Sequence, residues 1–563
     1  MKLPSRITFC LLASLMTLAS GCSQGNNGNQ NTCQKDYAYD WRGLLPGPGE
    51  AGYDAELALT AARRDRQFHV FHALPTGANA EISISYDKTA ERQAIEDFLL
   101  NEDGWDFEAS TGYKITDIID SWWKVAGAYA GVGIAADAFR YGVMRDQCYP
   151  AAEVERARQH LLNGLAALHM AVALTGIEGG IVRGFANKNY PGAAGTEELV
   201  DLFDENGDPL PAEKNNGTWR ADNSGDYPDI VWEDSCSRDM LIGWAVAFGG
   251  AWEVIENDPV ISDLVKQTMR ADALAVAANL KTVQANGYDL ELIDADGRTT
   301  YHGYLNENNL DRTYIDGARN GFHTIMALGI VAALADVADD SEINDWLYDE
   351  LIDDREFAII AHDGITLVNM EEGTNFSNYN MAFEGAWLAL RHIRDDQVAR
   401  ADILQALEVE LYDTPGKRFQ PVEMGQTFFD LTYVAGKCGA SSAWGCKTEP
   451  DQAAIDRAIQ TLSEFPAPPF WDFFRENCDQ SEIDSGFCIA EDGETELTVL
   501  GEVGRNGDLI TAEPLPMRLR GPSNYYWRSN PYKPNGGAEN SSGMFAGPDF
   551  RIGYWMARWI RRP

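Results

Sequence analysis

The chain has 563 residues, with 87 Asp or Glu against 45 Lys or Arg, so its formal net charge is −42. This balance argues against nucleic acid and anionic membrane surfaces as partners, because both would be repelled. The length allows several domains. No Pro- or Ser-rich linker follows residue 35, however, so we predict one domain over 36–563.

The first residues have the pattern of an export signal. Lys2 and Arg6 precede the apolar run Ile7–Leu18, and small residues lead to Cys22. This order predicts a signal peptide over 1–21. The position of Cys22 resembles the lipidated cysteine of a bacterial lipobox, which implies a lipid anchor followed by a flexible tether over 22–35. An ordinary signal peptide with an unmodified cysteine is the alternative.

Export by this route implies a protein of the bacterial envelope, either periplasmic or at the cell surface. No later stretch reads as long and apolar enough to span a bilayer, so the lipid would be the only membrane contact. We expect a monomer.

Helical patterning begins after the tether, with helices expected at 53–74 and 88–101 and possible short strands at 68–74 and 81–86. Four helical hairpins follow, in which an Ala- and Gly-rich helix, a tight acidic turn and a second helix succeed one another. They are predicted at 115–174, 235–285, 316–361 and 377–412. A β-hairpin with a turn at Asp296-Gly297 is expected within 287–303. Further helices are predicted at 419–435, 450–464 and 549–562.

Long connections separate the hairpins, at 176–234, 287–315 and 363–376. If neighbouring helices are antiparallel, the tight turns gather at one end of the assembly and the long loops at the other. Binding and chemistry concentrate on long loops carried by a rigid scaffold. We therefore expect the functional site at the loop end.

The first helix of each hairpin mixes glycines with aromatic residues, as at Gly127, Gly131 and Gly133, which predicts an inner position; the second helices alternate apolar and charged faces and are expected outside. This division resembles the (α/α) toroid of the six-hairpin glycosidase-like superfamily. The resemblance rests on architecture and on segments such as 234–243 and 553–558. It implies an all-α, (α/α)6-like toroid with small β-hairpins at one end, and a carbohydrate cleft there.

Seven cysteines follow Cys22, and an oxidising compartment favours disulfides. Local pairs are expected between Cys438 and Cys446 and between Cys478 and Cys488. Cys33 and Cys148 could join the tether to the first tight turn. Cys236 is then left over, as a buried thiol in a helix.

The expected starts of the inner helices share Asp or Ser. They are Asp120, Asp234, Asp316 and Ser377. Such residues are good N-caps, because their oxygens accept bonds from the free N–H groups of the first turn. Each one is therefore interpreted first as a cap, although all four would surround the same mouth.

The densest polar segment is 232–239, where carboxylates stand beside Trp232 and Arg238. Glycoside cleavage needs two carboxyl groups across the scissile bond. Asp234 and Asp239 are the candidate catalysts here. Glu384, one to two turns into another inner helix, is the expected partner, with Asp120 as second choice; a buried structural carboxylate is the alternative for Glu384.

Aromatic, amide and Arg side chains at the loop end suit a carbohydrate, since rings stack on sugars and polar groups bond hydroxyls. A segment near the C-terminus is aromatic and cationic, and is expected to form a lid or to pack the last helix. The candidate substrate-binding residues are Trp232, Arg238, Arg183, His302, Tyr304, Asn378, Tyr379, Asn380, Trp527 and Arg528.

No complete calcium loop, zinc signature, nucleophile elbow, phosphate-binding loop or haem motif is found, so no metal or cofactor is predicted. The leading hypothesis is an exported lipoprotein that hydrolyses a polysaccharide or oligosaccharide. A polysaccharide lyase acting on a uronate-containing glycan is the alternative enzyme, with Tyr or His as base. The third hypothesis is a glycan-binding surface lipoprotein without catalysis.

Overall fold

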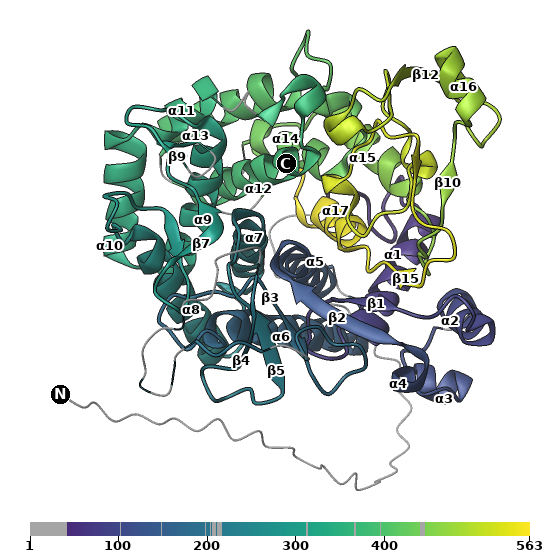
Figure 1. Cartoon of the computed structure of the whole chain (residues 1–563), viewed down its shortest axis with the longest axis horizontal. Coiled ribbons are helices and arrows are strands. Elements are labelled where there is room, and N and C mark those ends of the chain that lie inside the picture. Colours follow the sequence, from purple (N-terminus) through teal and green to yellow (C-terminus); the bar gives the residue numbers. More distant parts are fainter. Residues whose placement is uncertain are drawn as a thin grey trace, which may run out of the picture. The chain divides into compact units, whose positions relative to one another are not determined.

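A computed structural model describes residues 42–563, except 102, 148, 197–198, 203, 205, 207–209, 211–216, 311–312, 365–367, 395 and 440–444 (Figure 1). These residues belong to one compact unit, Trp41–Pro563. The signal peptide, the tether, Cys22, Cys33 and Cys148 lie outside the described residues.

Six mostly buried helices contact one another in a closed cycle, each packing on the next and the last returning to the first. In order they are α5 (Gly127–Asp146), α7 (Arg238–Ile255), α9 (Gly321–Ala338), α12 (Phe376–His392), α14 (Thr427–Lys437) and α17 (Pro548–Trp559). Figure 1 shows α17, near the C-terminus, beside α5. The inner position expected for the Ala- and Gly-rich helices is therefore confirmed.

The other long helices keep one face exposed, as amphipathic patterning predicts. They pack on the outside of the six, and are α1 (Ala55–Gln67), α6 (Ala151–Ala173), α8 (Asp263–Lys281), α10 (Ser341–Asp345) with the π-helix η2 (Trp346–Asp354), α11 (Phe357–Gly364), α13 (Gln397–Gln405) with the π-helix η5 (Ala406–Tyr412), and α15 (Gln452–Ser463). The predicted hairpins thus exist, with π-helical stretches inside two of the outer segments.

Glycines let the inner helices approach backbone to backbone. A Cβ added at Gly131 of α5 would lie 1.8 Å from the carbonyl oxygen of Gly243 on α7. Gly329 of α9 and Gly385 of α12 meet in the same way, at 2.3 Å. The close contact explains why small residues recur on these helices.

Gly131→Ala is expected to destabilise the fold by about 1–3 kcal/mol, because the backbone of α7 cannot yield as a flexible side chain would. Thermal unfolding measures the effect. Gly104→Ala is the matched control, since its Cβ would meet only Ser110 Oγ, at 4.0 Å. Equal melting temperatures for both variants would contradict the tight α5–α7 contact.

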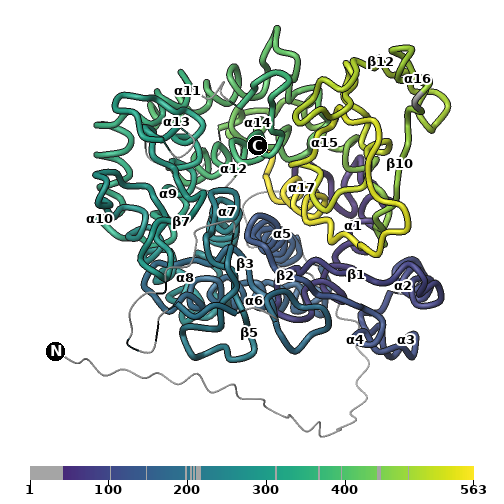
Figure 2. Tube along the Cα trace, in the orientation of Figure 1, coloured from purple at the N-terminus to yellow at the C-terminus, as the bar shows by residue number. Residues whose placement is uncertain are grey.

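A six-stranded antiparallel sheet corrects the all-α expectation. Its order is β15-β1-β2-β3-β5-β4. The strands are β1 (Ala80–Ser83), β2 (Ser121–Ala126), β3 (Gly184–Asn187), β4 (Trp219–Ala221), β5 (Ile230–Glu233) and β15 (Gly543–Met544). Figure 2 follows the late chain segment that carries β15 to its place beside β1, near the start of the described chain.

Two local predictions near the N-terminus meet different outcomes. Residues 68–74 are no strand, because Phe68–His72 form the π-helix η1 that continues α1. The strand expected at 81–86 exists as β1, shifted by a few residues.

The first hairpin starts later than predicted, since only Ile115–Ile118 (α4) is helical before β2.

The remaining elements, apart from α2, are short. They are α2 (Thr89–Asn101), α3 (Phe107–Thr111), β6 (Glu291–Ile293), β7 (Thr299–Tyr304), β8 (Asn309–Leu310), β9 (Thr313–Tyr314), η4 (Glu371–Gly373), η6 (Pro421–Glu423), β10 (Arg475–Glu476), α16 (Gln480–Ser485), β11 (Phe487–Ile489), β12 (Glu496–Gly501), η7 (Arg505–Gly507), β13 (Ile510–Thr511), η8 (Met517–Leu519), η9 (Tyr526–Arg528) and β14 (Asn535–Gly536). The predicted β-hairpin is β6–β7, with Gly297 at positive φ in its turn.

The two local disulfides are confirmed, between Cys438 and Cys446 and between Cys478 and Cys488. Cys236 is a free buried thiol. It precedes α7 rather than lying in a helix, which corrects that part of the prediction.

Helix α9 is an exception to the expectation that no later stretch is long and apolar enough to cross a membrane. It meets that test by length and composition. Its side chains are almost all buried against α7, α8, α11 and α12, however, which is the position of a core helix.

Candidate functional site

None of the four expected caps caps an inner helix. Asp120 precedes strand β2, and it accepts bonds from Ser85 N and from Lys88 Nζ, both at 2.6 Å. Asp316 accepts from Tyr288 Oη at 2.5 Å. The caps of α9 and α12 are Asn320 and Asn375, whose side chains accept from first-turn N–H groups.

Asp234 has a structural role. It is buried at the end of β5, where the Arg220 guanidinium donates to its Oδ2 at 2.7–2.8 Å. The backbone N–H of Thr218 donates to its other oxygen at 2.8 Å. A buried carboxylate paired in this way stabilises the strands around it and has little freedom to act as a catalyst.

Asp239, in the first turn of α7, lies in a different environment. Arg528 Nη2 donates to its Oδ2 at 2.9 Å, and the Ser237 hydroxyl donates to its Oδ1. Arg183 in turn donates to Ser237 Oγ at 2.8 Å. The Asp239 side chain keeps 19% of its surface exposed.

Arg528 joins the starts of three inner helices. Besides Asp239 on α7, its Nε donates to Ser377 Oγ on α12 at 2.7 Å, and its Nη1 donates to Tyr129 Oη on α5 at 3.4 Å. Its guanidinium carbon lies 5.5 Å from the centre of the Tyr129 ring. The C-terminal segment, expected to form a lid or to pack the last helix, thus places Arg528 of η9 at these helix starts.

Glu384 completes the group from the third turn of α12. Its side chain is buried, with 2% exposed, and burial raises its pKa to about 8 against the smaller opposing effects of a hydrogen bond to Asn380 and of Arg528. Among the described residues its Oε1 has no hydrogen-bond partner. Glu384 is therefore protonated at neutral pH, which leaves it with a proton to donate.

Asp239 titrates in the opposite direction. Burial raises its pKa, but the charge of Arg528, the Ser237 hydrogen bond and Arg183 outweigh burial and hold the pKa below the usual value. The two carboxyls are close enough to influence each other electrostatically. We call Tyr129, Ser237, Asp239, Ser377, Glu384 and Arg528 the Asp239–Arg528 cluster; it holds one ionised and one protonated carboxyl, the division that acid–base catalysis needs.

No protein-family model, curated protein or solved structure matches this chain.

A cavity of about 140 Å³ lies beside the cluster and was not foreseen. Glu81, Tyr129 and Asn524 line it together with other residues of β1 and β15. Burial raises the pKa of Glu81, while Lys124 and Asn524 oppose the shift. Asn524 belongs to the C-terminal segment that sequence reasoning singled out, but nothing in the sequence tied Glu81 to it.

Several of the residues predicted to bind substrate are not part of the Asp239–Arg528 cluster. Trp232 and Trp527 are fully buried and present no ring to a ligand. Tyr379 is buried and donates to the Phe419 carbonyl at 3.3 Å. Arg238 lies beside Phe322 and His323. The structure thus corrects the expectation that these side chains form one platform.

Others are closer to expectation. Arg183 reaches the cluster through Ser237, and Asn380 bonds Glu384 from one turn earlier. Asn378, half-buried, is on the first turn of α12 with Ser377. His302 and Tyr304 are on β7, which packs on α7. Among the described residues, no group of three or more His, Cys, Asp or Glu side chains is arranged to hold a metal ion.

Proposed function

We propose that the six inner helices and their outer partners form an (α/α)6-like toroid, similar to the six-hairpin glycosidase-like superfamily. The closed cycle of helix contacts supports this proposal. So does the position of the Asp239–Arg528 cluster, which lies at the starts of α5, α7 and α12, at the end to which the long connections lead.

We propose that the protein is a glycoside hydrolase, with Glu384 as general acid and Asp239 as base or nucleophile. The observation that carries the proposal is the pair of opposite pKa shifts around Arg528. Glycoside cleavage requires one carboxyl that gives a proton to the leaving oxygen and one carboxylate that activates water or attacks the sugar. Burial keeps the carboxyl of Glu384 protonated, as the first role requires. Arg528, Arg183 and Ser237 keep Asp239 ionised, as the second role requires.

The cluster favours hydrolysis over elimination. A lyase needs a Tyr or His base beside the uronate carboxylate. Tyr129 is the tyrosine in contact with Arg528, and burial raises its pKa, which makes its anion hard to form at neutral pH. The histidine and tyrosines considered for that role, His302, Tyr304 and Tyr379, are not in the cluster.

The experiment incubates the protein with neutral and acidic polysaccharides, following reducing ends and the ultraviolet absorbance of unsaturated uronates. Hydrolysis gives reducing ends alone. Absorbance together with reducing ends would show that the protein is a lyase and not a hydrolase. Glycan binding without either signal would show that it binds glycans without cleaving them. Asp239→Asn is expected to remove the hydrolytic signal.

Replacing Arg528 by Gln is expected to move both limbs of the pH–rate profile to higher pH. Arg528 lowers the pKa of Asp239 and also that of Glu384, so its loss raises both values. The profile of kcat/KM against pH measures the change. A lower rate with both limbs unmoved would assign Arg528 a purely structural role.

We also propose that the protein is an exported lipoprotein. The signal-like first 21 residues and Cys22 support this, and the two disulfides are compatible with an oxidising compartment. Cys22→Ser is expected to move the protein from the membrane fraction to the soluble envelope fraction. If the protein were found in the same fractions as before, the first 21 residues would be an ordinary signal peptide and Cys22 would carry no lipid.

A further inference from the structure

A second cavity, of about 460 Å³, lies outside the Asp239–Arg528 cluster, lined by segments of η1, α6, β3 and β5. Its size is within the roughly 300–1,000 Å³ typical of small-molecule sites. Two imidazoles on its wall, those of His69 and His160, are stacked with ring centres 3.6 Å apart and planes inclined by 16°. We call it the imidazole cavity.

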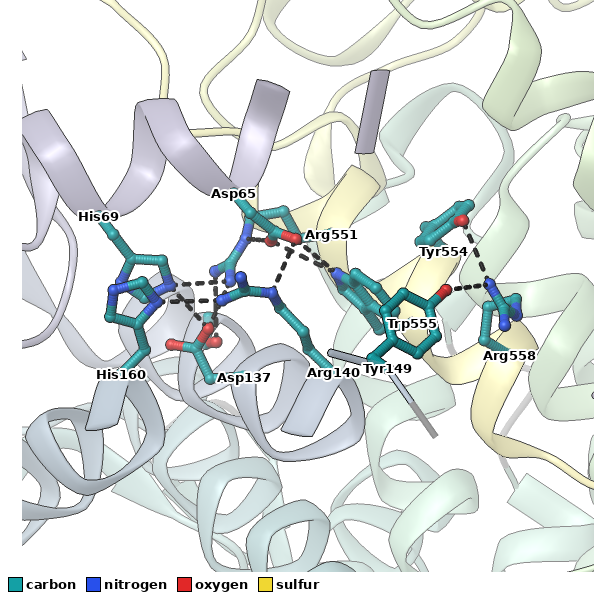
Figure 3. A network of polar contacts seen from close by, with 11 residues as sticks. Asp65, His69, Asp137, Arg140, Tyr149, His160, Arg551, Tyr554, Trp555 and Arg558 are labelled. Carbon is teal, nitrogen blue, oxygen red and sulfur yellow. Dashed lines mark hydrogen bonds and ion pairs between the residues drawn. The ribbon is translucent and has the colours of Figure 1, made fainter. Parts of the chain in front are cut away.

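A buried ion network fixes both rings from behind (Figure 3). Arg551 pairs with Asp65 at 2.7 Å and also with Asp137, while Arg140 Nε lies 3.1 Å from Asp65 Oδ2. Two arginines thus face two aspartates, and their formal charges cancel. The network holds the histidines in place without giving the cavity a net charge.

The hydrogen bonds assign a tautomer to each ring. His69 Nε2 lies 2.8 Å from Asp137 Oδ1 and 3.3 Å from Arg551 Nη2. The shorter contact is to the carboxylate, which can only accept, so Nε2 carries the proton and His69 Nδ1 is an acceptor. Arg140 donates to His160 Nδ1 at 3.0 Å, so the proton of His160 is on Nε2. Among the described residues, neither His69 Nδ1 nor His160 Nε2 has a further partner. The pair therefore offers one acceptor and one donor.

Both rings stay neutral. Burial lowers the pKa of each histidine, and the nearby arginines lower it further. In the described part of the chain, no Asp, Glu, Lys or Arg lines this cavity, although the whole protein carries a charge of −42. The other polar side chains are Thr76, Asn163 and Asn187, which are neutral too.

Apolar groups complete the wall, among them Pro75, Met170 and Ile230. A charged ligand would lose its hydration there without meeting an opposite charge, which is costly. A ligand with several hydroxyls around a C–H-bearing ring matches both the neutral donors and acceptors and the apolar surface.

We propose that the imidazole cavity is a second binding site, for an uncharged polyhydroxylated ring such as a neutral sugar, whose hydroxyls donate to His69 Nδ1 and accept from His160 Nε2. This inference does not depend on the proposed hydrolase activity, because none of the cluster residues lines the cavity.

The test measures binding of glucose, glucuronate and glucosamine to the protein by calorimetry or saturation-transfer NMR. These probes share a ring and differ in charge. Glucose is expected to bind, with the two charged analogues at least about tenfold weaker. Absence of glucose binding, or equal binding of the anion or the cation, would overturn the proposal.

Asn163→Leu is the first variant, because Asn163 is exposed on α6, lines the cavity and is outside the buried network. Gln460→Leu on α15 is its matched control, because Gln460 is also exposed and lies outside the lining. We expect glucose affinity to fall about tenfold in the first and to stay unchanged in the second. His160→Phe, which keeps a stacked ring but removes the donor, is expected to weaken binding similarly.

Glu384→Gln separates the two sites. Glucose binding that survives this variant and fails in Asn163→Leu supports the imidazole cavity. Binding that fails in Glu384→Gln and survives Asn163→Leu would place the sugar in the Asp239–Arg528 cluster and overturn the inference. The melting temperature of each variant shows whether it is folded. If His160→Phe does not fold, the result for Asn163→Leu alone decides whether the sugar binds in the imidazole cavity.

Discussion

Replacing Glu384 by Gln is expected to lower kcat/KM for glycan hydrolysis by about a hundred- to ten-thousand-fold, the range typical of losing a general acid. Gln has the shape of Glu but cannot donate an acidic proton. In the parent protein, kcat/KM should fall as pH rises through the Glu384 pKa of about 8, because the acid is then lost. Initial rates from pH 5 to 10 test both statements.

Glu384→Gln should also gain stability relative to the parent protein as the pH rises. The pKa of Glu384 is about 8 in the folded protein against 4.5 for an ordinary Glu, so folding retains a proton that the unfolded chain releases. Stability is therefore lost as pH rises from about 4.5 to 8, by an amount on the order of a few kcal/mol. Glu384→Gln removes this loss, and melting temperatures at pH 5 and 9 measure it.

Asp120→Asn is the control for catalysis. Asp120 pairs with Lys88 and lies outside the cluster, so its replacement should leave the rate within about twofold. If Glu384→Gln retained full activity, or Asp120→Asn abolished it, the assignment of the general acid would be wrong.

Arg551→Met is expected to destabilise the protein by about 3–5 kcal/mol, the largest stability effect that the structure predicts. Arg551 is fully buried and pairs with Asp65 and Asp137, both also buried. Removing it leaves two carboxylates with one arginine in a medium that solvates charge poorly. Chemical unfolding monitored by Trp fluorescence tests this, since Trp555 Nε1 donates to Asp65 at 3.0 Å.

The matched control removes an arginine from an exposed pair. Arg270 lies 3.3 Å from Asp339, and both side chains are well exposed. Arg270→Met should cost no more than about 1 kcal/mol. Similar shifts for the two variants would mean that the buried network contributes no more than a surface ion pair.

Periodicity in the sequence predicted most of the long helices, because glycines and aromatics mark inner helices and alternating faces mark outer ones. It missed the six-stranded sheet. Its strands are two to six residues long, and β1 pairs with β15, more than 450 residues away in the sequence. Such pairing leaves no local pattern, so Ser121–Ala126 was included in a helical hairpin.

For a related reason, the sequence did not distinguish a structural carboxylate from the candidate catalysts. Asp239 and Glu384 were expected to be partners. Arg528 bonds Asp239, and its charge also lowers the pKa of Glu384. Asp234 was chosen on the same evidence as Asp239, five residues away. The two aspartates differ in the arginine that they contact, which is Arg220 for Asp234 and Arg528 for Asp239. No spacing in the sequence predicts which arginine contacts which aspartate.

Arg528 also determines when the site can exist. It bonds side chains on α5, α7 and α12, and is itself followed by strand β15 and helix α17, which close the sheet and the cycle of helices. A chain still being synthesised or translocated lacks this arginine until nearly its whole length has emerged. The cluster therefore cannot be complete before residue 528 has emerged. Fragments released by early termination or by proteolysis before residue 528 carry the two carboxyls but not the arginine that lowers both of their pKa values.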